Sequence, residues 1–172
     1  RRGLQARLSD VASYDEQGGR AIGEIAAAAT SLAAEGWLAR IAEGAPFGAI
    51  ETLLAAVRGL AYARAEQGAE AGYGLETELA EPTPALIEAA APAAHALDTL
   101  VRPMVALGKR LEAVLADAPD WMDGPARARI EGAIASLGWR AGTVAGWLAL
   151  LARVGGPADP RFVDWLAVDR IE

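Results

Sequence analysis

The chain has no cysteine, and this absence excludes several kinds of site within its 172 residues. Without a thiol there is no disulfide, no thiolate zinc site, no cysteine-ligated iron–sulfur cluster and no cysteine nucleophile. The single histidine, His95, lies between alanines in an expected helix. An imidazole there is more often a partly buried helix residue than a base or a metal ligand. We therefore expect no catalytic residue, no cofactor and no metal ligand in this segment.

Nucleotide-binding and nucleophile motifs are missing as well. The phosphate loop G-x-x-x-x-G-K-[ST] does not occur, and the only lysine, Lys109, falls within helical sequence. No serine has the histidine or elbow context of a nucleophile. Asp117, Asp120 and Asp123 recur every third residue, which could suggest a cation site, but they lack the glycine and distal glutamate of an EF-hand. Turn formation and helix capping are favoured for them, with Asp123 at a helix start.

Basic charge and long apolar runs are also scarce. The net charge of −7 argues against nucleic-acid binding by bulk electrostatics, although it leaves a local basic stripe open. No unbroken apolar run approaches the roughly 18 to 20 residues of a membrane span. The most apolar window, residues 144–154, is about half that length and is flanked by arginines. We expect a cytoplasmic protein without a membrane span.

What the chain does contain is helical sequence, since 53% of its residues are hydrophobic and alanine and leucine dominate them. Apolar residues that recur every three to four positions predict amphipathic helices. Helices are expected at residues 4–14, 19–34 and 84–116, and a further helix begins at 44–46. A helical turn is expected at 37–41. The last helix follows a turn at 117–125 and runs to about residue 153. Pro92 and Pro103 lie inside the longest helix, so we expect a kink or a break at one of them.

The two longest helices carry apolar residues at heptad spacing. In the helix at 84–116 these positions are Leu97, Leu100, Met104, Leu107, Leu111 and Val114. In the last helix they are Ile130, Ile134, Leu137, Ala141, Val144, Leu148 and Leu151. The helix that begins at 44–46 has a shorter apolar stripe of Phe47, Ile50, Leu54, Val57 and Ala61. Such stripes predict a hairpin whose helices pack at a shallow angle on each other and on the helix that carries the shorter stripe. The predicted fold class is all-α, an elongated antiparallel helical bundle with a long C-terminal helical hairpin and a short terminal strand.

The last residues depart from the helical pattern. Residues 160–171 are rich in aromatic and β-branched residues, follow a Gly-Gly-Pro breaker at 155–157, and predict a buried strand. No further strand follows, so we expect this one to lack a partner within the chain. A tail folded back on the bundle is the alternative. Leu75, Thr77 and Leu79 alternate with glutamates as in an exposed edge strand, but a solvated linker is favoured for residues 67–84.

One candidate nucleic-acid surface remains in spite of the acidic composition. Basic residues on both sides of the hairpin turn could form a ribbon near its tip, namely Arg102, Lys109, Arg110, Arg127 and Arg129. The alternative is an ordinary solvated surface with helix pairs such as Lys109–Glu112 and Arg127–Glu131. The residue pattern by itself favours this alternative.

Two tryptophans on the last helix are a candidate partner surface. Trp139 and Trp147 lie eight residues apart on one side of the helix, away from its heptad stripe. They could bury a contact with a third helix, or present a surface for stacking or for a protein partner. Core packing is the more common role and is favoured.

The C-terminal residues 162–172, FVDWLAVDRIE, resemble a segment of the DinG-type ATP-dependent DNA helicases, which are relatives of the XPD helicases. In that family the segment returns from a helical insertion into the motor core. The preceding parts are similar in order: an Arg-rich opening helix, a turn at 44–46, Tyr-Gly-Leu-Glu at 73–76, a long helix, and residues 127–151. The resemblance covers most of the chain, and the terminal strand and the Tyr-Gly-Leu-Glu element are its distinctive parts.

This resemblance implies an accessory, arch-like domain at residues 1–154, followed by a linker and strand at 155–172 that return to a motor domain. In that family the arch closes over single-stranded DNA as the strand passes through the motor, during unwinding in replication or repair. ATP, Mg²⁺ and the nucleotide-binding motifs belong to the motor domains, so no ATPase activity is expected of this segment alone. Many family members carry a cysteine-ligated iron–sulfur cluster, which this segment cannot hold.

Two other functions stay open. A free-standing helical protein–protein interaction module predicts a self-contained fold and a definite oligomer. A small-molecule-binding regulator predicts stabilisation by a ligand, but no convergent polar pocket residues are visible in the sequence. A helicase fragment instead predicts an unsatisfied C-terminal strand and weak, salt-sensitive binding of single-stranded DNA.

Overall fold

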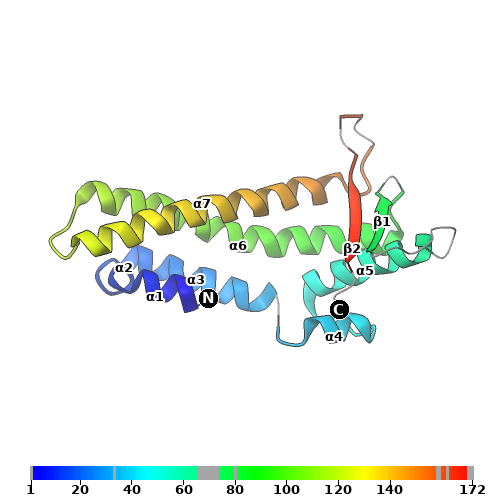
Figure 1. Cartoon of the computed structure of the whole chain (residues 1–172), viewed down its shortest axis with the longest axis horizontal. Helices are drawn as coiled ribbons and strands as arrows, with labels where there is room; N and C mark the ends of the chain where they lie inside the picture. Colours follow the sequence, from blue (N-terminus) through cyan, green and yellow to red (C-terminus); the bar gives the residue numbers. More distant parts are fainter. Residues whose placement is uncertain are drawn as a thin grey trace. The chain divides into compact units, whose positions relative to one another are not determined.

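The computed structural model describes residues 2–32, 34–65, 74–79, 81–157, 160–161 and 163–169, and helices dominate these segments. The elements are α1 (Arg2–Arg7), α2 (Ser9–Tyr14), α3 (Glu16–Leu32), α4 (Trp37–Ala42), α5 (Gly48–Ala65), β1 (Gly74–Glu78), α6 (Pro84–Asp117), α7 (Gly124–Arg153) and β2 (Trp165–Asp169), as Figure 1 shows. The prediction of an all-α helical bundle is confirmed.

The chain forms two compact units. Unit 1 comprises Arg1–Ser31 and Leu97–Gly146, and unit 2 comprises Leu32–Ala96 and Trp147–Glu172. The long helices α6 and α7 contribute residues to both units. The boundary at residue 154, between an arch-like bundle and a returning strand, stays a prediction.

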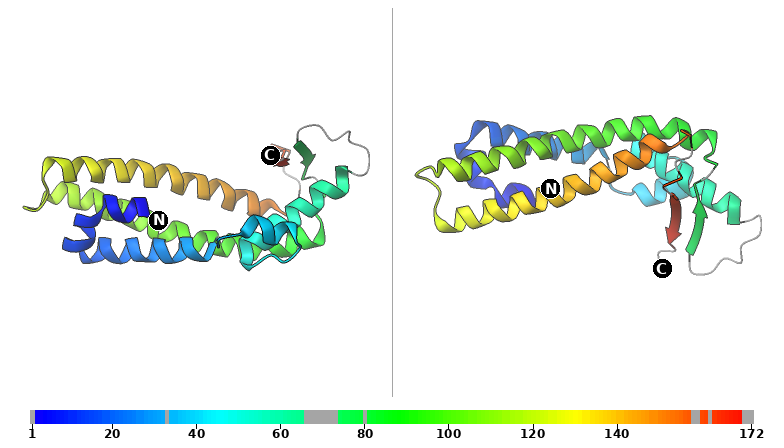
Figure 2. Two further views of the ribbon diagram at one scale, coloured as in Figure 1. Left: turned by 60° about the horizontal axis from the view of Figure 1, so that its bottom comes forward. Right: turned by 90° about the horizontal axis from the view of Figure 1, so that it is seen from above.

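Unit 1 is built around a cluster of buried apolar side chains. Its members are Leu8, Val11, Ala21, Ile22, Ile25, Met104, Leu107, Leu111, Val114, Ile130, Ala133 and Leu137. Within this unit α6 and α7 run antiparallel and α3 lies alongside them (Figure 2). The cluster contains six of the predicted heptad positions, Met104, Leu107, Leu111, Val114, Ile130 and Leu137, and Leu100, Ile134 and Ala141 pack against it. The third helix in the core of unit 1 is α3, which the heptad argument did not predict.

The shorter stripe predicted for α5 is also displaced. Phe47 lies just before the helix and is 69% exposed, whereas Leu60 and Ala61 are buried. Glu51, only 2% exposed, accepts hydrogen bonds from Arg40 Nε at 2.9 Å and from the backbone N–H of Phe47 at 2.8 Å. The hydrogen bond from Arg40, more than the other contacts, lowers the pKa of Glu51. A carboxylate with this set of partners can be buried, which a count of apolar residues does not detect.

Helix α6 runs uninterrupted through Pro92 and Pro103, so the expected break is absent. A proline in a helix interior removes one backbone hydrogen bond and costs about 3 kcal/mol. Near Pro103, the side chains of Met104 and Leu107 are buried. Each fully buried side chain of this kind contributes about 1.5 to 3 kcal/mol, which offsets the cost of the proline.

Strands β1 and β2 of unit 2 pair antiparallel, with Gly74 opposite Asp169 and Glu78 opposite Trp165. Beyond the paired residues, the backbone N–H of Leu79 donates to the carbonyl of Asp164 at 2.8 Å. Two predictions are therefore wrong: the terminal strand has a partner in this chain, and residues 74–78 are a strand and not a solvated linker. Pairing satisfies backbone groups that neither segment can satisfy alone. Residues 67–73 and 80 of the predicted linker lie outside the described residues, and so do residues 162 and 170–172 of the predicted terminal segment.

Two arginines of unit 2 bind the β1–β2 ribbon at one end, the end at which Glu78 lies opposite Trp165. Arg153, in the last turn of α7, makes two hydrogen bonds to Asp164, with Nε–Oδ2 at 3.1 Å and Nη2–Oδ1 at 2.6 Å. Arg64, in the last turn of α5, donates to the carbonyl of Glu81 at 2.8 Å and to the carbonyl of Glu78. A bidentate arginine–carboxylate pair fixes geometry as well as contributing energy. The ribbon is thus attached to α5 and α7 within unit 2.

Helix α7 is long and apolar enough to cross a membrane, by length and composition alone. The core helix of a protein that spans no membrane passes the same test, but such a helix is mostly buried. Here 11% of the most apolar 18-residue window is buried. The absence of a membrane span stays a prediction.

Candidate functional site

Arg110, one of the five predicted DNA-contacting residues, is used inside unit 1. Its Nε donates to both carboxylate oxygens of Asp15, at 2.9 Å to Oδ2 and 3.1 Å to Oδ1, and its Nη2 forms an ion pair with Oδ2. The same carboxylate accepts the backbone N–H of Gly18 at 2.6 Å and so caps the start of α3. The hydrogen bond from Arg110 lowers the pKa of Asp15, helped by the Gly18 N–H and opposed by burial. This arginine is a structural residue.

Three of the other predicted residues also have carboxylate partners. Arg102 forms an ion pair with Asp98 on its own helix, and Arg129 forms one with Asp10 of α2. Arg127 lies 3.9 Å from Glu131, the partner expected from the sequence, and donates to the carbonyl of Leu115 at 3.4 Å. Lys109 is exposed and makes no ion pair with a described residue, so the alternative pair Lys109–Glu112 is not formed.

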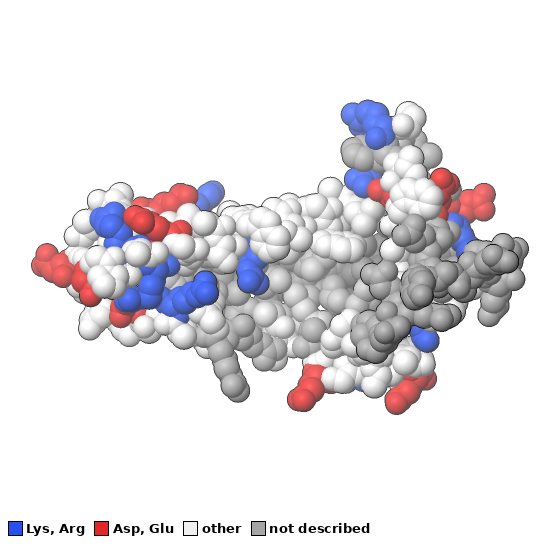
Figure 3. All heavy atoms as spheres, viewed as in Figure 1, with Lys and Arg blue, Asp and Glu red and all other residues white. Residues whose placement is uncertain are grey.

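The basic side chains therefore do not form an unbroken positive surface among the described residues. On the face drawn in Figure 3, basic and acidic atoms lie next to one another over the part of unit 1 near the α6–α7 turn. Surface ion pairs of this kind contribute only about 0 to 1 kcal/mol each, so they exchange readily for other partners. Arg102 and Arg129 can exchange a carboxylate for a phosphate at small cost, whereas Arg110 cannot without leaving the carboxylate of Asp15, which is 10% exposed, without its cation.

The tryptophans of α7 are exposed, and the favoured core role is wrong for both. Trp139 of unit 1 is 73% exposed and Trp147 of unit 2 is 52% exposed. Neither ring has an aromatic partner among the described residues; the ring stacking found there pairs Trp121 with Tyr14, whose centroids lie 5.7 Å apart. An exposed indole is a large apolar surface with one hydrogen-bond donor, which suits a partner contact.

One aspartate of the hairpin turn, Asp123, follows the capping prediction. Asp123 Oδ1 accepts the backbone N–H of Ala126 at 2.7 Å, at the start of α7, and this confirms its role as a helix cap. Among the described residues, no group of three or more histidines and carboxylates is arranged to hold a metal ion.

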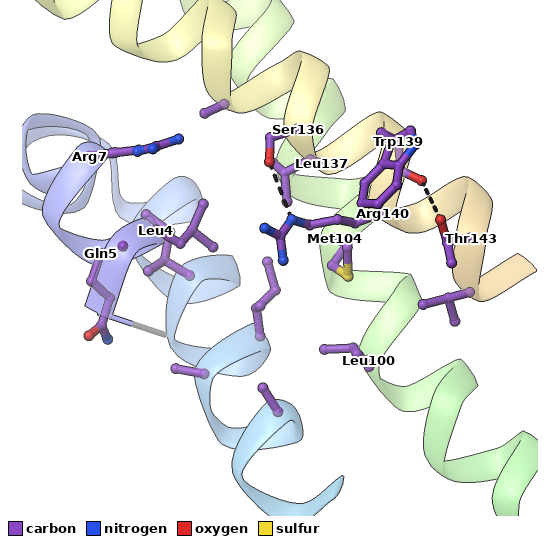
Figure 4. A pocket seen from close by; sticks show the side chains of 17 residues that line it. Leu4, Gln5, Arg7, Leu100, Met104, Ser136, Leu137, Trp139, Arg140 and Thr143 are labelled. Carbon is purple, nitrogen blue, oxygen red and sulfur yellow. Dashed lines mark hydrogen bonds between the residues drawn. The ribbon is translucent and has the colours of Figure 1, made fainter. Parts of the chain in front are cut away.

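A pocket of about 470 Å³ lies in unit 1, among α1, α3, α6 and α7. Its walls are Gly3, Leu4, Gln5, Arg7, Ile22, Ile25, Ala26, Ala29, Leu100, Met104, Ala133, Ser136, Leu137, Trp139, Arg140, Thr143 and Val144. In Figure 4 the Arg140 side chain extends from α7 into the space that Leu4 and Met104 also face. Trp139 is thus both exposed and part of the pocket wall.

The only charged residues of this wall are Arg7 and Arg140. Arg140 Nε donates to Ser136 Oγ at 3.3 Å, and neither arginine forms an ion pair with a described residue. Neither was predicted as a site residue from the sequence. The available signal was Arg140, the one basic residue of α7 between Arg129 and Arg153.

Comparison of the chain with protein-family models, with curated proteins and with solved structures finds no match.

Proposed function

We propose that the chain is an accessory helical domain of an ATP-dependent DNA helicase, which guides single-stranded DNA during unwinding. The sequence resemblance of residues 73–76 and 162–172 supports this, together with Lys109, an exposed cation on α6 that makes no ion pair with a described residue. The pairing of β1 with β2, with Leu75 opposite Val168 and Glu76 opposite Ala167, counts the other way, because a helicase fragment was expected to leave its C-terminal strand unpaired.

In this role the domain supplies shape and a few phosphate contacts, and the motor domains supply ATP and Mg²⁺. Lys109 is available for a phosphate without losing an ion pair, and Arg102 and Arg129 exchange exposed pairs for one. Arg110 keeps its structural pair with Asp15. The net charge of −7 limits the affinity of the domain by itself, so binding is weak and sensitive to salt.

The test is binding of a fluorescent single-stranded oligonucleotide, measured by anisotropy over a range of salt concentrations. Each phosphate contact contributes about 0.7 to the slope of log affinity against log salt. The double variant Lys109→Gln with Arg129→Gln should lower that slope by about 1.4, whereas Arg20→Gln, an exposed arginine outside the predicted set, should leave it unchanged. Absence of salt-sensitive binding, or an equal effect of Arg20→Gln, contradicts the proposal.

A second candidate is a free-standing helical interaction module, and the exposure of Trp139 favours it. The partner assigned here is a second copy of the chain, because a definite oligomer is what this alternative predicts. Sedimentation analysis tests it: the interaction module gives a concentration-dependent oligomer that Trp139→Ser weakens. A monomer at all concentrations contradicts it and leaves the helicase role untouched.

A further inference from the structure

We propose that the pocket of unit 1 binds a small amphipathic carboxylate, with its apolar chain between the helices and its head group at Arg7 and Arg140. This site goes beyond the helicase role and does not depend on it. A medium-chain fatty acid has the required chemistry, with one negative charge at the end of a flexible apolar body.

The size and lining of the pocket fit such a ligand. Its volume of about 470 Å³ lies in the range of roughly 300 to 1,000 Å³ that is common for small-molecule sites. The apolar walls come from all four helices, with Leu4 from α1, Ile22 and Ile25 from α3, Met104 from α6 and Leu137 from α7. These side chains would remove a hydrocarbon chain from water, at about 0.8 kcal/mol for each buried methylene.

The charges of the pocket select the head group. In a chain with a net charge of −7, this wall contains two arginines and no carboxylate. Other arginines of unit 1, such as Arg110 and Arg129, are paired with aspartates. Arg7 and Arg140 have no such partner among the described residues, so their positive charge is not neutralised locally. An anion gains from this arrangement and a cation is repelled.

Arg140 is held in a position to meet a ligand. Its Nε is engaged by Ser136 Oγ at 3.3 Å, and its Nη nitrogens make no hydrogen bond to the described part of the chain. A guanidinium can present two parallel N–H donors to one carboxylate, which fixes the direction of the ligand. Figure 4 shows Arg7 projecting from α1, on the opposite side of the pocket from α7.

Three probes with the same apolar chain separate the two parts of the proposal. Decanoate, 1-decanol and decyltrimethylammonium are titrated into the whole chain below their micellar concentrations, and binding is measured by calorimetry. Decanoate is expected to bind with 1:1 stoichiometry, the alcohol about tenfold more weakly and the cation not measurably, because two exposed charge pairs together give about that factor. Equal affinity for all three probes overturns the assignment of the head group.

Variants of the pocket residues then test where the hydrocarbon chain of decanoate binds. Ala26 lines the pocket and Ala27 is its exposed neighbour on α3, so Ala26→Leu and Ala27→Leu add the same side chain to the same helix. Ala26→Leu should weaken decanoate binding at least tenfold, and Ala27→Leu should not change it. Arg7→Gln with Arg140→Gln should weaken decanoate about tenfold and leave decanol unchanged, with Arg20→Gln as the control. Thermal unfolding of each variant confirms that it is folded.

Two results would overturn the proposal. No binding of decanoate to the wild-type chain overturns the proposal. Decanoate binding that survives Ala26→Leu places the ligand elsewhere, and also overturns it. None of these results bears on DNA binding, which is measured separately through Lys109 and Arg129.

Discussion

Arg110 and Asp15, 95 residues apart in the chain, form an ion pair that joins α6 to the start of α3. The aspartate also caps α3 through the backbone N–H of Gly18. One carboxylate thus fixes where α3 begins and where it lies on α6. This arrangement removes Arg110 from the predicted DNA-contacting set and makes it a determinant of stability.

Replacing Arg110 by glutamine should lower the free energy of unfolding by about 1 to 2 kcal/mol, because a charged hydrogen-bonded pair with a partly exposed arginine is lost. Urea unfolding followed by circular dichroism measures this difference. Lys109→Gln is the matched control on the neighbouring residue and should change stability by less than about 0.5 kcal/mol. Equal effects of the two variants would contradict the structural role of Arg110.

The pair also predicts how stability depends on pH. The folded pKa of Asp15 is lowered, chiefly by its hydrogen bond from Arg110. Its contribution is therefore fully present above the unfolded pKa of about 3.9 and is lost as pH falls through the folded pKa. The stability difference between the wild-type chain and Asp15→Asn should be constant at neutral pH and should shrink in this acidic range. If this stability difference grew on acidification, the lowered pKa of Asp15 would be contradicted.

Gly18 should not tolerate a side chain. A Cβ added there would lie 2.5 Å from Val11 Cγ1 of α2, inside the core of unit 1. Gly18→Ala should therefore destabilise the chain by about 1 to 3 kcal/mol, as overpacking does. Gly23→Ala on the same helix meets no atom within 4 Å and should stabilise it by about 0.5 to 1 kcal/mol through helix propensity. Thermal unfolding of both variants checks the contrast, and similar shifts in Tm would disprove it.

The β1–β2 ribbon should be visible in hydrogen exchange. A strand with one neighbour points only every second amide at its partner, so alternate amides of Trp165–Asp169 are expected to exchange more slowly than those of an unpaired segment. Asp164→Ala removes the bidentate contact with Arg153 and should speed this exchange about fivefold, which corresponds to about 1 kcal/mol. Asp120→Ala, in the hairpin turn, is the control. Fast exchange of every amide at residues 165–169 in the wild-type chain would refute the pairing.

Much of the helical architecture was predictable from sequence, because heptad stripes and caps are local signals. The positions of α6 and α7, the burial of Leu107 and Leu111, and the cap at Asp123 follow from spacing alone. The β1–β2 pairing joins segments about ninety residues apart, and a single sequence contains no signal that brings them together. The terminal strand was predicted from its composition, whereas residues 74–78 were interpreted as a solvated linker and the pairing was not predicted.

The candidate sites were harder to predict than the helices. Five basic residues were grouped by helix position, but their acidic partners lie on other segments, as Asp10 does for Arg129 and Asp15 for Arg110. The wall of the pocket comes from four helices, so its two arginines belong to one site only through packing. Trp139 was assigned to the core because large apolar residues usually are buried, and its position off the stripe was the better guide.

The most direct test of the helicase account is the coding sequence on both sides of this segment. The account predicts a phosphate loop and an Asp-Glu-Ala-His-like box upstream in the same reading frame, and a second motor domain downstream of Glu172. A start codon immediately before Arg1 and a stop codon soon after Glu172 would contradict it, and the interaction module would then be the leading function.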